Sequence, residues 1–509
     1  MKELIKATRN YREKLLSDPY RPTYHFAIAD DDGRPGDPNG AFYADGIYHL
    51  MYLYRNSSDN GFHWGHISST DLLHWRHHKD ALGIHNGDGG CFSGGAFVDD
   101  DKRAYLTFWK FGAVDGSDNS GIAMAYADPP YEDWYRMEPI AVNGSRWGIT
   151  DMEIGGETLH LGNADPSNIW KVGDTYYMQL GNLCVLNEYG RSEDSLEKYK
   201  GDWTELYKSK DLKNWEYIHR FYENPHLDED YPDATEDDMC PSFLPLYDKY
   251  EGGEFTGKYL QLFIAHNKGT QYYIGKLEGE KFIPESHGRM SCADNSFFAP
   301  EALIDGKRRH IMWAWLLDNL KDDFNKYGWS GVYSFPRVLW LEKGVLKMAP
   351  AKELDNLQYN KVIPEIKEDN SIEINKGQAY RLKATFKAEN DGKVGFSIKV
   401  DDEKGESTDI YYDKVNKKLV FESRHDSLPC EHDMKKREEM PFSLSENEDL
   451  ELDIFVDKAV VEVYANEKQA ICRRSYPADP EKAVGVKLIG AKEKLIKLEA
   501  YSMAPANLY

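Results

Sequence analysis

The sequence predicts an all-β protein, a five-bladed β-propeller followed by a C-terminal antiparallel β-sandwich. Five segments that start at residues 40, 96, 167, 241 and 300 share one design. Each has a short apolar strand, a polar or glycine-containing turn and an aromatic-rich strand, as in a β-hairpin. Roughly 55 to 75 residues separate successive starts, which is typical of propeller blades. After about residue 365, apolar and polar residues alternate strictly, which is typical of sandwich strands.

These patterns divide the chain of 509 residues, which is too long for a single core, into four parts. Residues 1–20 are an N-terminal segment with a short amphipathic helix, whose apolar face holds Leu4, Ala7, Tyr11 and Leu15. Residues 21–345 are the propeller, 346–364 a linker and 365–509 the sandwich. An internal repeat supports duplicated blades, because Ser69–Trp75 and Ser209–Trp215 match at Ser, Asp, Leu and Trp.

The composition excludes several classes of function. With 63 basic and 87 acidic residues the net charge is −24, so we expect no nucleic-acid partner and no membrane partner. The six cysteines stand singly and show no metal-type spacing, and no phosphate or dinucleotide motif is present, so we expect no metal and no cofactor. The charged N-terminus has no apolar stretch typical of a secretory signal. We therefore expect a cytoplasmic enzyme, and the oligomeric state stays open.

Three carboxylates just ahead of predicted blades are the candidate catalytic groups. Asp37 and Asp165 each precede a proline, ahead of the first and third hairpins, and Glu236 precedes the fourth. An Asp-Pro step can be an ordinary turn, but two at equivalent places in a repeat fold indicate a shared role. Strands that open blades line the central channel, so the three acids should converge at one mouth. Paired carboxylates are the usual groups for cleaving a glycosidic bond.

The third acid lies in a run of three, Glu236, Asp237 and Asp238. Burial and mutual repulsion would raise the pKa of the most enclosed one, as a general acid requires. In an extended segment Glu236 and Asp238 share a face and Asp237 points away. The alternative is a solvated acidic loop.

At these residues the chain resembles glycoside hydrolase family 32, the β-fructofuranosidase, invertase, levanase and inulinase family, over nearly its whole length. The family fold is a five-bladed propeller followed by a sandwich. The motifs that carry the resemblance are Tyr24–Phe26, Asp37–Gly40, Trp64–Trp75, Phe92–Gly94, Asp165–Pro166, Cys240–Pro241 and Val461–Asn466.

The resemblance implies a retaining glycosidase that cleaves β-fructofuranosidic bonds in sucrose, fructo-oligosaccharides or fructans. Asp37 would be the nucleophile, Glu236 the acid/base and Asp165 the transition-state stabiliser. The expected substrate-binding residues are Asn39, Trp64, Phe92, Ser93 and Asp238, with Trp64 as a platform for a sugar ring.

Departures from the family pattern leave the substrate open. The chain has Arg34–Gly36 before the nucleophile, Leu53 where glutamine is common, Met239 before the cysteine, and Ala164 where the family has an arginine before Asp-Pro. Arg55 is a candidate to replace that arginine. The alternatives are a fructosyltransferase of the same fold, another five-bladed furanosidase such as an arabinofuranosidase, and a glycan-binding propeller without catalysis.

Overall fold

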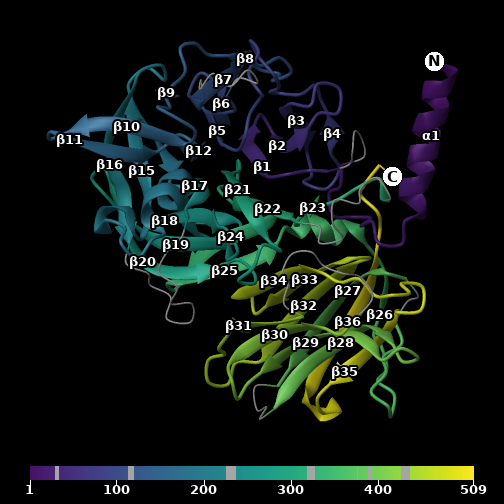
Figure 1. Ribbon diagram of the computed structural model, residues 1–509. Coiled ribbons are helices and arrows are strands. Elements are labelled where there is room, and N and C mark those ends of the chain that lie inside the picture. The colour runs from purple at the N-terminus through teal and green to yellow at the C-terminus, as the bar shows by residue number, and fades with distance from the viewer. Residues whose placement is uncertain are drawn as a thin grey trace.

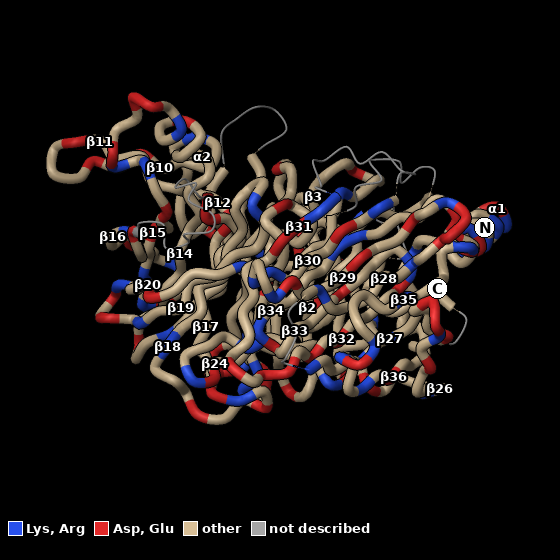
Figure 2. Tube along the Cα trace, turned by 90° about the horizontal axis from the view of Figure 1, so that it is seen from below, with Lys and Arg blue, Asp and Glu red and all other residues tan. Residues whose placement is uncertain are grey.

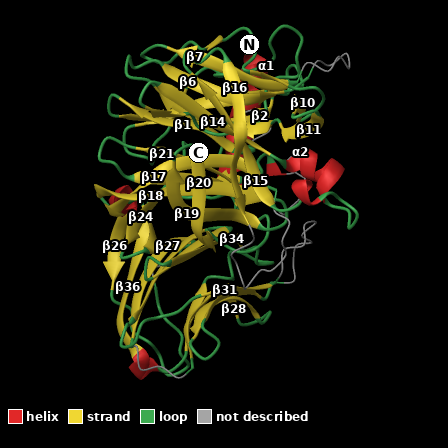
Figure 3. Ribbon diagram, turned by 90° about the vertical axis from the view of Figure 1, so that its left-hand side faces the viewer, coloured by secondary structure: helices red, strands yellow, loops and turns green. Residues whose placement is uncertain are grey.

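The computed structural model describes residues 1–28, 34–112, 120–224, 237–317, 327–374, 377–387, 392–425 and 436–508. Strands dominate these residues, and Figure 3 shows helix in only a few places. Helix α1 (Lys2–Ser17) begins the chain, and α2 (Leu183–Val185) continues directly into a π-helical turn, Leu186–Gly190. Short 3₁₀ turns cover Glu197–Tyr199, Lys352–Leu357 and Lys492–Lys494. The expectation of a mostly β protein is confirmed.

Five antiparallel sheets follow one another along the first part of the chain. The first has β1 (Pro38–Ala44), β2 (Ile47–Arg55), β3 (Phe62–Ser69) and β4 (Arg76–His77). The second has β5 (Ala96–Val98), β6 (Ala104–Lys110), β7 (Gly121–Ala127), β8 (Tyr135–Arg136) and β9 (Val142–Asn143). A separate hairpin, β10 (Ile149–Ile154) and β11 (Glu157–Gly162), leads to the third sheet.

The third sheet has β12 (Ala164–Pro166), β13 (Trp170–Val172), β14 (Thr175–Gly181), β15 (Asp202–Ser209) and β16 (Trp215–Asn224). The fourth has β17 (Met239–Lys249), β18 (Gly252–Ala265), β19 (Gly269–Glu278) and β20 (Lys281–Arg289). The fifth has β21 (Phe298–Ile304), β22 (His310–Leu316), β23 (Val332–Tyr333), β24 (Arg337–Glu342) and β25 (Val345–Pro350). Four of the five hairpins expected from the sequence supply the first two strands of their sheets, whereas the third, expected at 167–178, forms β13 and β14 and is preceded by β12.

The first strand of each sheet, here called the inner strand, is the one that meets its counterparts. Inner strand β1 contacts β5 and β21, β21 contacts β17, and β17 contacts β12. Between the second and third sheets the Thr107 hydroxyl donates to the Ser167 carbonyl at 2.8 Å. In Figure 1 these inner strands lie around the middle of the upper part of the molecule. The residues that open each sheet are thereby brought to one place.

Local sequence explains the hairpins. In the first, Asp45 and Gly46 form the turn with φ of 49° and 88°, which is the geometry of a tight turn that Asp-Gly favours. Aromatic side chains fill the space between neighbouring sheets, and Trp64 and Phe108 are both fully buried. Such rings remove a large apolar area from water per residue.

Two further antiparallel sheets form the C-terminal part. One contains β26 (Gln358–Val362), β36 (Leu495–Met503), β27 (Ala379–Phe386), β32 (Leu450–Asp457), β33 (Val460–Ala465) and β34 (Gln469–Arg474). The other contains β31 (Arg437–Pro441), β30 (Lys418–Ser423), β29 (Glu406–Asp413), β28 (Lys393–Asp401) and β35 (Gly485–Ile489). Apolar side chains from both sheets share one core.

Residues 346–364, which the sequence predicted to be a linker, contain most of β25, a 3₁₀ turn and β26. Strand β25 ends at Pro350 and completes the fifth sheet, whereas β26 pairs with β36 at the edge of a C-terminal sheet. A single 3₁₀ turn, Lys352–Leu357, separates them. Hydrogen bonding of both flanks to neighbouring strands overrides the loop-like local composition.

The N-terminal segment ties the two parts together. Asp457 accepts hydrogen bonds from the backbone of Thr23, Tyr24 and His25 and from the His25 ring, at 2.7 to 2.9 Å. In helix α1, Leu15 is buried but Leu4 is 66 % exposed, so only the end of the predicted apolar face packs. In Figure 2 acidic and basic residues are interspersed along both parts of the molecule.

Candidate active site

Asp37 is held immediately before β1 by backbone and side-chain hydrogen bonds. Its carbonyl accepts from Leu53 N at 3.0 Å and from Asn39 Nδ2 at 2.9 Å, and Gly36 N donates to the Leu53 carbonyl at 2.6 Å. Asn39 is buried, and its Oδ1 accepts from Gly94 N at 3.0 Å. The turn is therefore locked to β2 and to the second sheet, which fixes the carboxylate.

The Phe92–Gly94 motif supplies a direct partner. Ser93 Oγ donates to Asp37 Oδ2 at 2.5 Å. Gly94 has to be glycine, since a Cβ there would lie 1.9 Å from the Thr107 carbonyl. This close approach brings Ser93 to the carboxylate.

Asp165 and Cys240 occupy bulges at the start of β12 and β17. Both have left-handed backbones, with φ of 34° and 48°, which non-glycine residues seldom adopt. The register shifts at both places, between Ala164 and Pro166 and between Met239 and Ser242. Bulges re-aim side chains and are frequent at active sites. In β1 the corresponding bulge holds Gly40, so the two Asp-Pro steps are not at equivalent places.

A thiol links the two carboxylates. Cys240 Sγ lies 3.6 Å from Asp37 Oδ2 and 3.4 Å from Asp165 Oδ2. Burial, together with the charges of Asp165 and Asp37, raises the pKa of Cys240 well above its usual range, so the thiol stays protonated and donates. The sequence predicted only a small buried residue here, because no spacing pattern signals a contact across sheets.

Two carboxylates this close shift each other's ionisation. Burial, and then the charge of Asp37, raises the pKa of Asp165 to about 7. Burial also raises the pKa of Asp37, while hydrogen bonds from Ser93 and Cys240 offset part of that rise. Asp37 is therefore the acid whose surroundings favour the ionised form more, as a nucleophile needs.

These groups open onto a cavity of about 820 Å³. Its lining includes Asp37, Ser93 and Asp165, and an aromatic wall of Phe92, Trp109 and Trp147. Trp109 and Trp147 stack with ring centroids 4.2 Å apart. Aromatic faces beside polar groups suit the apolar and hydroxyl faces of a sugar ring.

His266 also lines this cavity, and the sequence did not single it out as a site residue. It follows β18 directly, and its ring Nδ1 lies 2.7 Å from Asp237 Oδ2. Asp237 was expected to point away from the site, but its carboxylate instead holds this cavity residue. Only the pairing of β17 with β18 brings positions 237 and 266 together.

The structure thus gathers Asp37, Asp165, Phe92 and Ser93 at the cavity, with Asn39 supporting Asp37. Trp64 is fully buried and its Nε1 donates to the Phe92 carbonyl at 3.1 Å, so its ring is not available as a sugar platform. The burial of Trp64 in the core between sheets corrects that expectation.

The run has two other acids, Asp238, which was expected to bind substrate, and Glu236, which was expected to be the acid/base. Asp238 is fully buried and does not line the cavity; its backbone N donates to Asn182 Oδ1 at 3.0 Å. Burial and the neighbouring Asp238 carboxylate raise the pKa of the Tyr222 hydroxyl. A direct substrate contact by Asp238 is therefore not supported. Glu236 lies outside the described residues.

Arg55 does not replace the arginine absent at Ala164. Its Nε donates to the Asn60 carbonyl at 3.2 Å, and it does not line the cavity. Ala164 itself is fully buried beneath the site.

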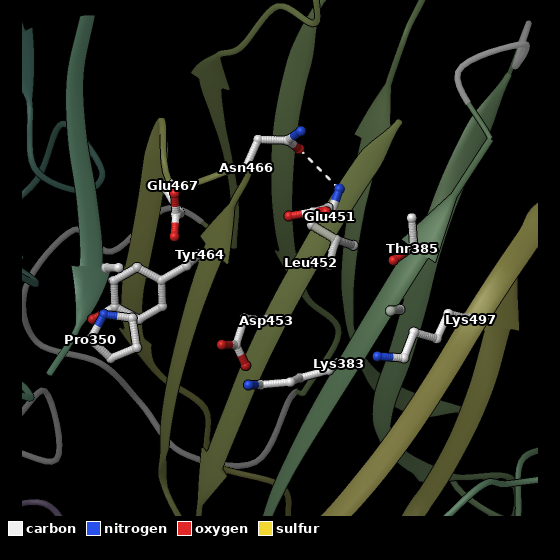
Figure 4. Close-up of a pocket in the computed structure, with 12 residues that line it drawn as sticks. Pro350, Lys383, Thr385, Glu451, Leu452, Asp453, Tyr464, Asn466, Glu467 and Lys497 are labelled. Carbon is white, nitrogen blue, oxygen red and sulfur yellow. Dashed lines mark hydrogen bonds between the residues drawn. The ribbon is translucent and has the colours of Figure 1, made fainter. Parts of the chain in front are cut away.

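A second cavity, of about 280 Å³, lies where Pro350 meets β27, β32 and β33 (Figure 4). Two of its charged side chains have partners close by: Asp453 accepts from Arg381 Nε at 2.7 Å, and Lys497 Nζ lies 3.1 Å from Glu499 Oε2. The buried carboxylate pair, Asp37 and Asp165, lies in the larger of these two cavities, and we assign the candidate active site there.

Among the described residues, no group of histidine, cysteine and acidic side chains is arranged to hold a metal ion. Within the same residues, no helix is long and apolar enough to cross a membrane.

Comparison with known proteins identifies the family. Residues 31–350 match the model of the glycosyl hydrolases family 32 N-terminal domain, and residues 351–502 match that of the family 32 C-terminal domain. Sucrose-6-phosphate hydrolase of Escherichia coli is 25 % identical over 498 residues, which cover 95 % of each chain. Levanase of Bacillus subtilis is 26 % identical over 490 residues, 89 % of this chain and 66 % of the relative.

Solved structures agree in fold. Sucrose-6-phosphate hydrolase from Lactobacillus gasseri has a TM-score of 0.74 at 20 % identity, covering 99 % of this chain and 97 % of its own. Fructan 1-exohydrolase IIa from Cichorium intybus has a TM-score of 0.75 at 20 % identity, covering 96 % and 98 %. With both family models matched across almost its full length, the chain belongs to glycosyl hydrolase family 32 and is a glycosidase.

Proposed function

We propose that this protein is a retaining β-fructofuranosidase that acts on sucrose, fructo-oligosaccharides or fructans. The observation that carries the proposal is the pair of carboxylates, Asp37 and Asp165, joined by the Cys240 thiol at the base of an aromatic-lined cavity. The relatives that match include a sucrose-6-phosphate hydrolase, a beta-fructofuranosidase and a fructan beta-fructosidase, which favours a fructoside as substrate. In this proposal the five sheets close into a five-bladed propeller and the C-terminal sheets form a β-sandwich.

In the first step Asp37 attacks the anomeric carbon of the fructosyl unit. A bond forms between that carbon and an Asp37 oxygen as the glycosidic carbon–oxygen bond breaks. Glu236 donates the proton that the departing oxygen needs; this assignment depends on the sequence motif, because Glu236 lies outside the described residues. Asp165 accepts hydrogen bonds from sugar hydroxyls and favours the oxocarbenium-like transition state.

In the second step Glu236 removes a proton from water, whose oxygen attacks the same carbon. The ester bond to Asp37 breaks, fructose leaves, and both carboxyl groups return to their starting states. The support for Asp37 as the group that cycles between carboxylate and ester is its geometry. Ser93 Oγ donates to Oδ2, and the Cys240 thiol lies 3.6 Å from the same oxygen, which leaves Oδ1 for the attack.

The test is a comparison of products released from sucrose, kestose, inulin, levan and difructose anhydrides. We expect the wild-type protein to release fructose from at least one β-fructoside with net retention at the anomeric carbon. The Asp37→Asn variant should fold and lose at least about three orders of magnitude in turnover. A variant that keeps more than about a tenth of the activity would remove Asp37 from the role of nucleophile. Arabinofuranoside cleavage in place of fructoside cleavage would overturn the substrate class.

A further inference from the structure

His266 and Asp237 form a pair whose geometry fixes the histidine ring. Asp237 is 2 % exposed, and its two oxygens accept from His266, Oδ1 from the backbone N–H and Oδ2 from ring Nδ1, each at 2.7 Å. Because Asp237 accepts from both the backbone and the ring of His266, it restricts rotation of the ring about the side-chain bonds. Because the hydrogen on Nδ1 is donated to Asp237, Nε2 is the ring nitrogen that can form a hydrogen bond with another group.

The ring is presented to the cavity. The His266 side chain is 43 % exposed, and it lines the same cavity as Asp37 and Asp165. Phe298 supports it from behind, edge to face, with ring centroids 5.4 Å apart. No described residue accepts a hydrogen bond from Nε2, so this nitrogen is available to a bound molecule.

The charges around His266 favour its protonated form. Burial disfavours the imidazolium, but the hydrogen bond to Asp237 and the charges of Asp237, Asp165 and Asp37 outweigh burial and raise the pKa of His266. Arg191 is a nearby positive charge and therefore acts against protonation of His266; its guanidinium lies 3.7 Å from Asp237 Oδ2. The interaction is mutual, since the charge of His266 offsets part of the rise that burial causes in the pKa of Asp37 and of Asp165.

The other cation that lines the cavity, among the residues described, is already engaged. The Arg146 guanidinium donates to Asp151 at 2.5 Å, to Glu188 at 3.3 and 3.4 Å, and to the Tyr189 hydroxyl. Those partners hold it at the rim, on the segment next to hairpin β10–β11. In the part of the chain that the structure describes, His266 is thus the cation-forming residue of this cavity that is left to face the carboxylate pair.

We propose that His266 is the cationic substrate-binding residue of this site. Asp237 positions the ring so that Nε2–H donates to a hydroxyl of the sugar bound over Asp37 and Asp165, while its positive charge helps to keep Asp37 ionised. The contact to a sugar rests on the proposed function. The electrostatic coupling of His266 to the two carboxylates does not depend on it.

The coupling is tested first, without any substrate. In protein labelled at histidine, NMR titration gives the pKa of His266, whose signal is the one absent from His266→Gln. We expect a value above about 6.5 in the wild type and a fall by about one unit or more in Asp237→Asn. Asp37→Asn should lower it as well, by removing a facing negative charge. A His266 pKa at or below the ordinary value, unmoved in Asp37→Asn, would overturn the proposal.

Kinetics then test the contact. His266→Gln should lower kcat/KM about tenfold to a hundredfold and move the acid limb of its pH profile upward, because Asp37 loses the neighbouring charge. The matched control is His74→Gln: His74 Nδ1 pairs with Asp71 at 2.8 Å, but that side chain is 59 % exposed and lies outside the cavity. It should match the wild type.

The pH profile of His266→Gln and the release of fructose by the wild type test different claims, the role of His266 and the proposed function. An unchanged pH profile in His266→Gln, with normal folding, refutes the role of His266 while leaving fructoside hydrolysis intact. If the wild type releases no fructose, the proposed function fails, and the NMR titration still decides whether His266 is coupled to the carboxylate pair.

Discussion

Replacing Asp165 by asparagine should make the protein more stable and less active. Asp165 is 7 % exposed and lies against Asp37 through the shared Cys240 thiol. Asparagine keeps the size of the side chain and can still accept the hydrogen bond from the thiol. It removes only the charge, which is the feature that burial opposes.

The magnitude follows from the shift in ionisation. Burial and the charge of Asp37 raise the pKa of Asp165 from 3.8 to about 7, and a shift of that size corresponds to about 4 kcal/mol in the free energy of unfolding. Because the pKa is raised in the folded state, the protonated acid stabilises the fold fully below the unfolded pKa. That stabilisation is lost as the pH rises toward about 7.

The assay is urea unfolding of wild type and Asp165→Asn at about pH 5 and about pH 8. The variant lacks this titration, so its advantage in the free energy of unfolding should grow by about 2 to 3 kcal/mol between the two conditions. Asp194→Asn, at an exposed aspartate, should behave like the wild type at both. The activity of Asp165→Asn should fall about a hundredfold or more, as expected when a group that stabilises the transition state is lost. An advantage that stays constant or shrinks with rising pH would refute the argument.

Three further predictions concern other parts of the mechanism and the fold. Glu236→Gln should slow substrates with poor leaving groups far more than activated aryl fructosides, with azide restoring the latter; the role passes to Asp238 if Asp238→Asn is the crippling change. Asn39→Ala should lower kcat about tenfold or more while unfolding stays cooperative, because the Asp37 turn loses two hydrogen bonds; unchanged kcat would count against it. Asp457→Asn should cost about 3 to 5 kcal/mol in urea unfolding, since it breaks a buried ion pair. Burial lowers the pKa of His25, but bonding to Asp457 and Glu462 outweighs burial and raises it. The Asp457 contribution is therefore largest below about pH 6.5 and smaller above it, and a pH-independent loss would contradict it.

The hairpins show most clearly which features local sequence can predict. The Asp45–Gly46 turn sits where two apolar runs meet, and both residues take the left-handed backbone that such a turn requires. Local information did not indicate the strands at residues 346–364. There β25 and β26 form because partner strands from distant parts of the chain supply their hydrogen bonds.

At the site, motifs with fixed spacing were the reliable guide for residues next to one another. Asp37 and Asn39 lie in one turn, and Phe92 and Ser93 in another, and the contact Ser93–Asp37 joins them. A motif does not reveal which of its members is buried, and Trp64 belongs to the core although its motif suggested a ligand platform.

The sequence by itself determined that the protein is mostly β, that hairpins recur along its first part, and that Asp37 and Asp165 stand at the entries to two sheets. These features are local, set by turn residues and by the alternation of side chains along a strand. Tertiary structure alone decided that Cys240 bridges the two carboxylates and that Asp237 turns His266 toward them. Those contacts join residues far apart in the chain, and the left-handed bulges that aim Asp165 and Cys240 at each other form only when neighbouring inner strands pack.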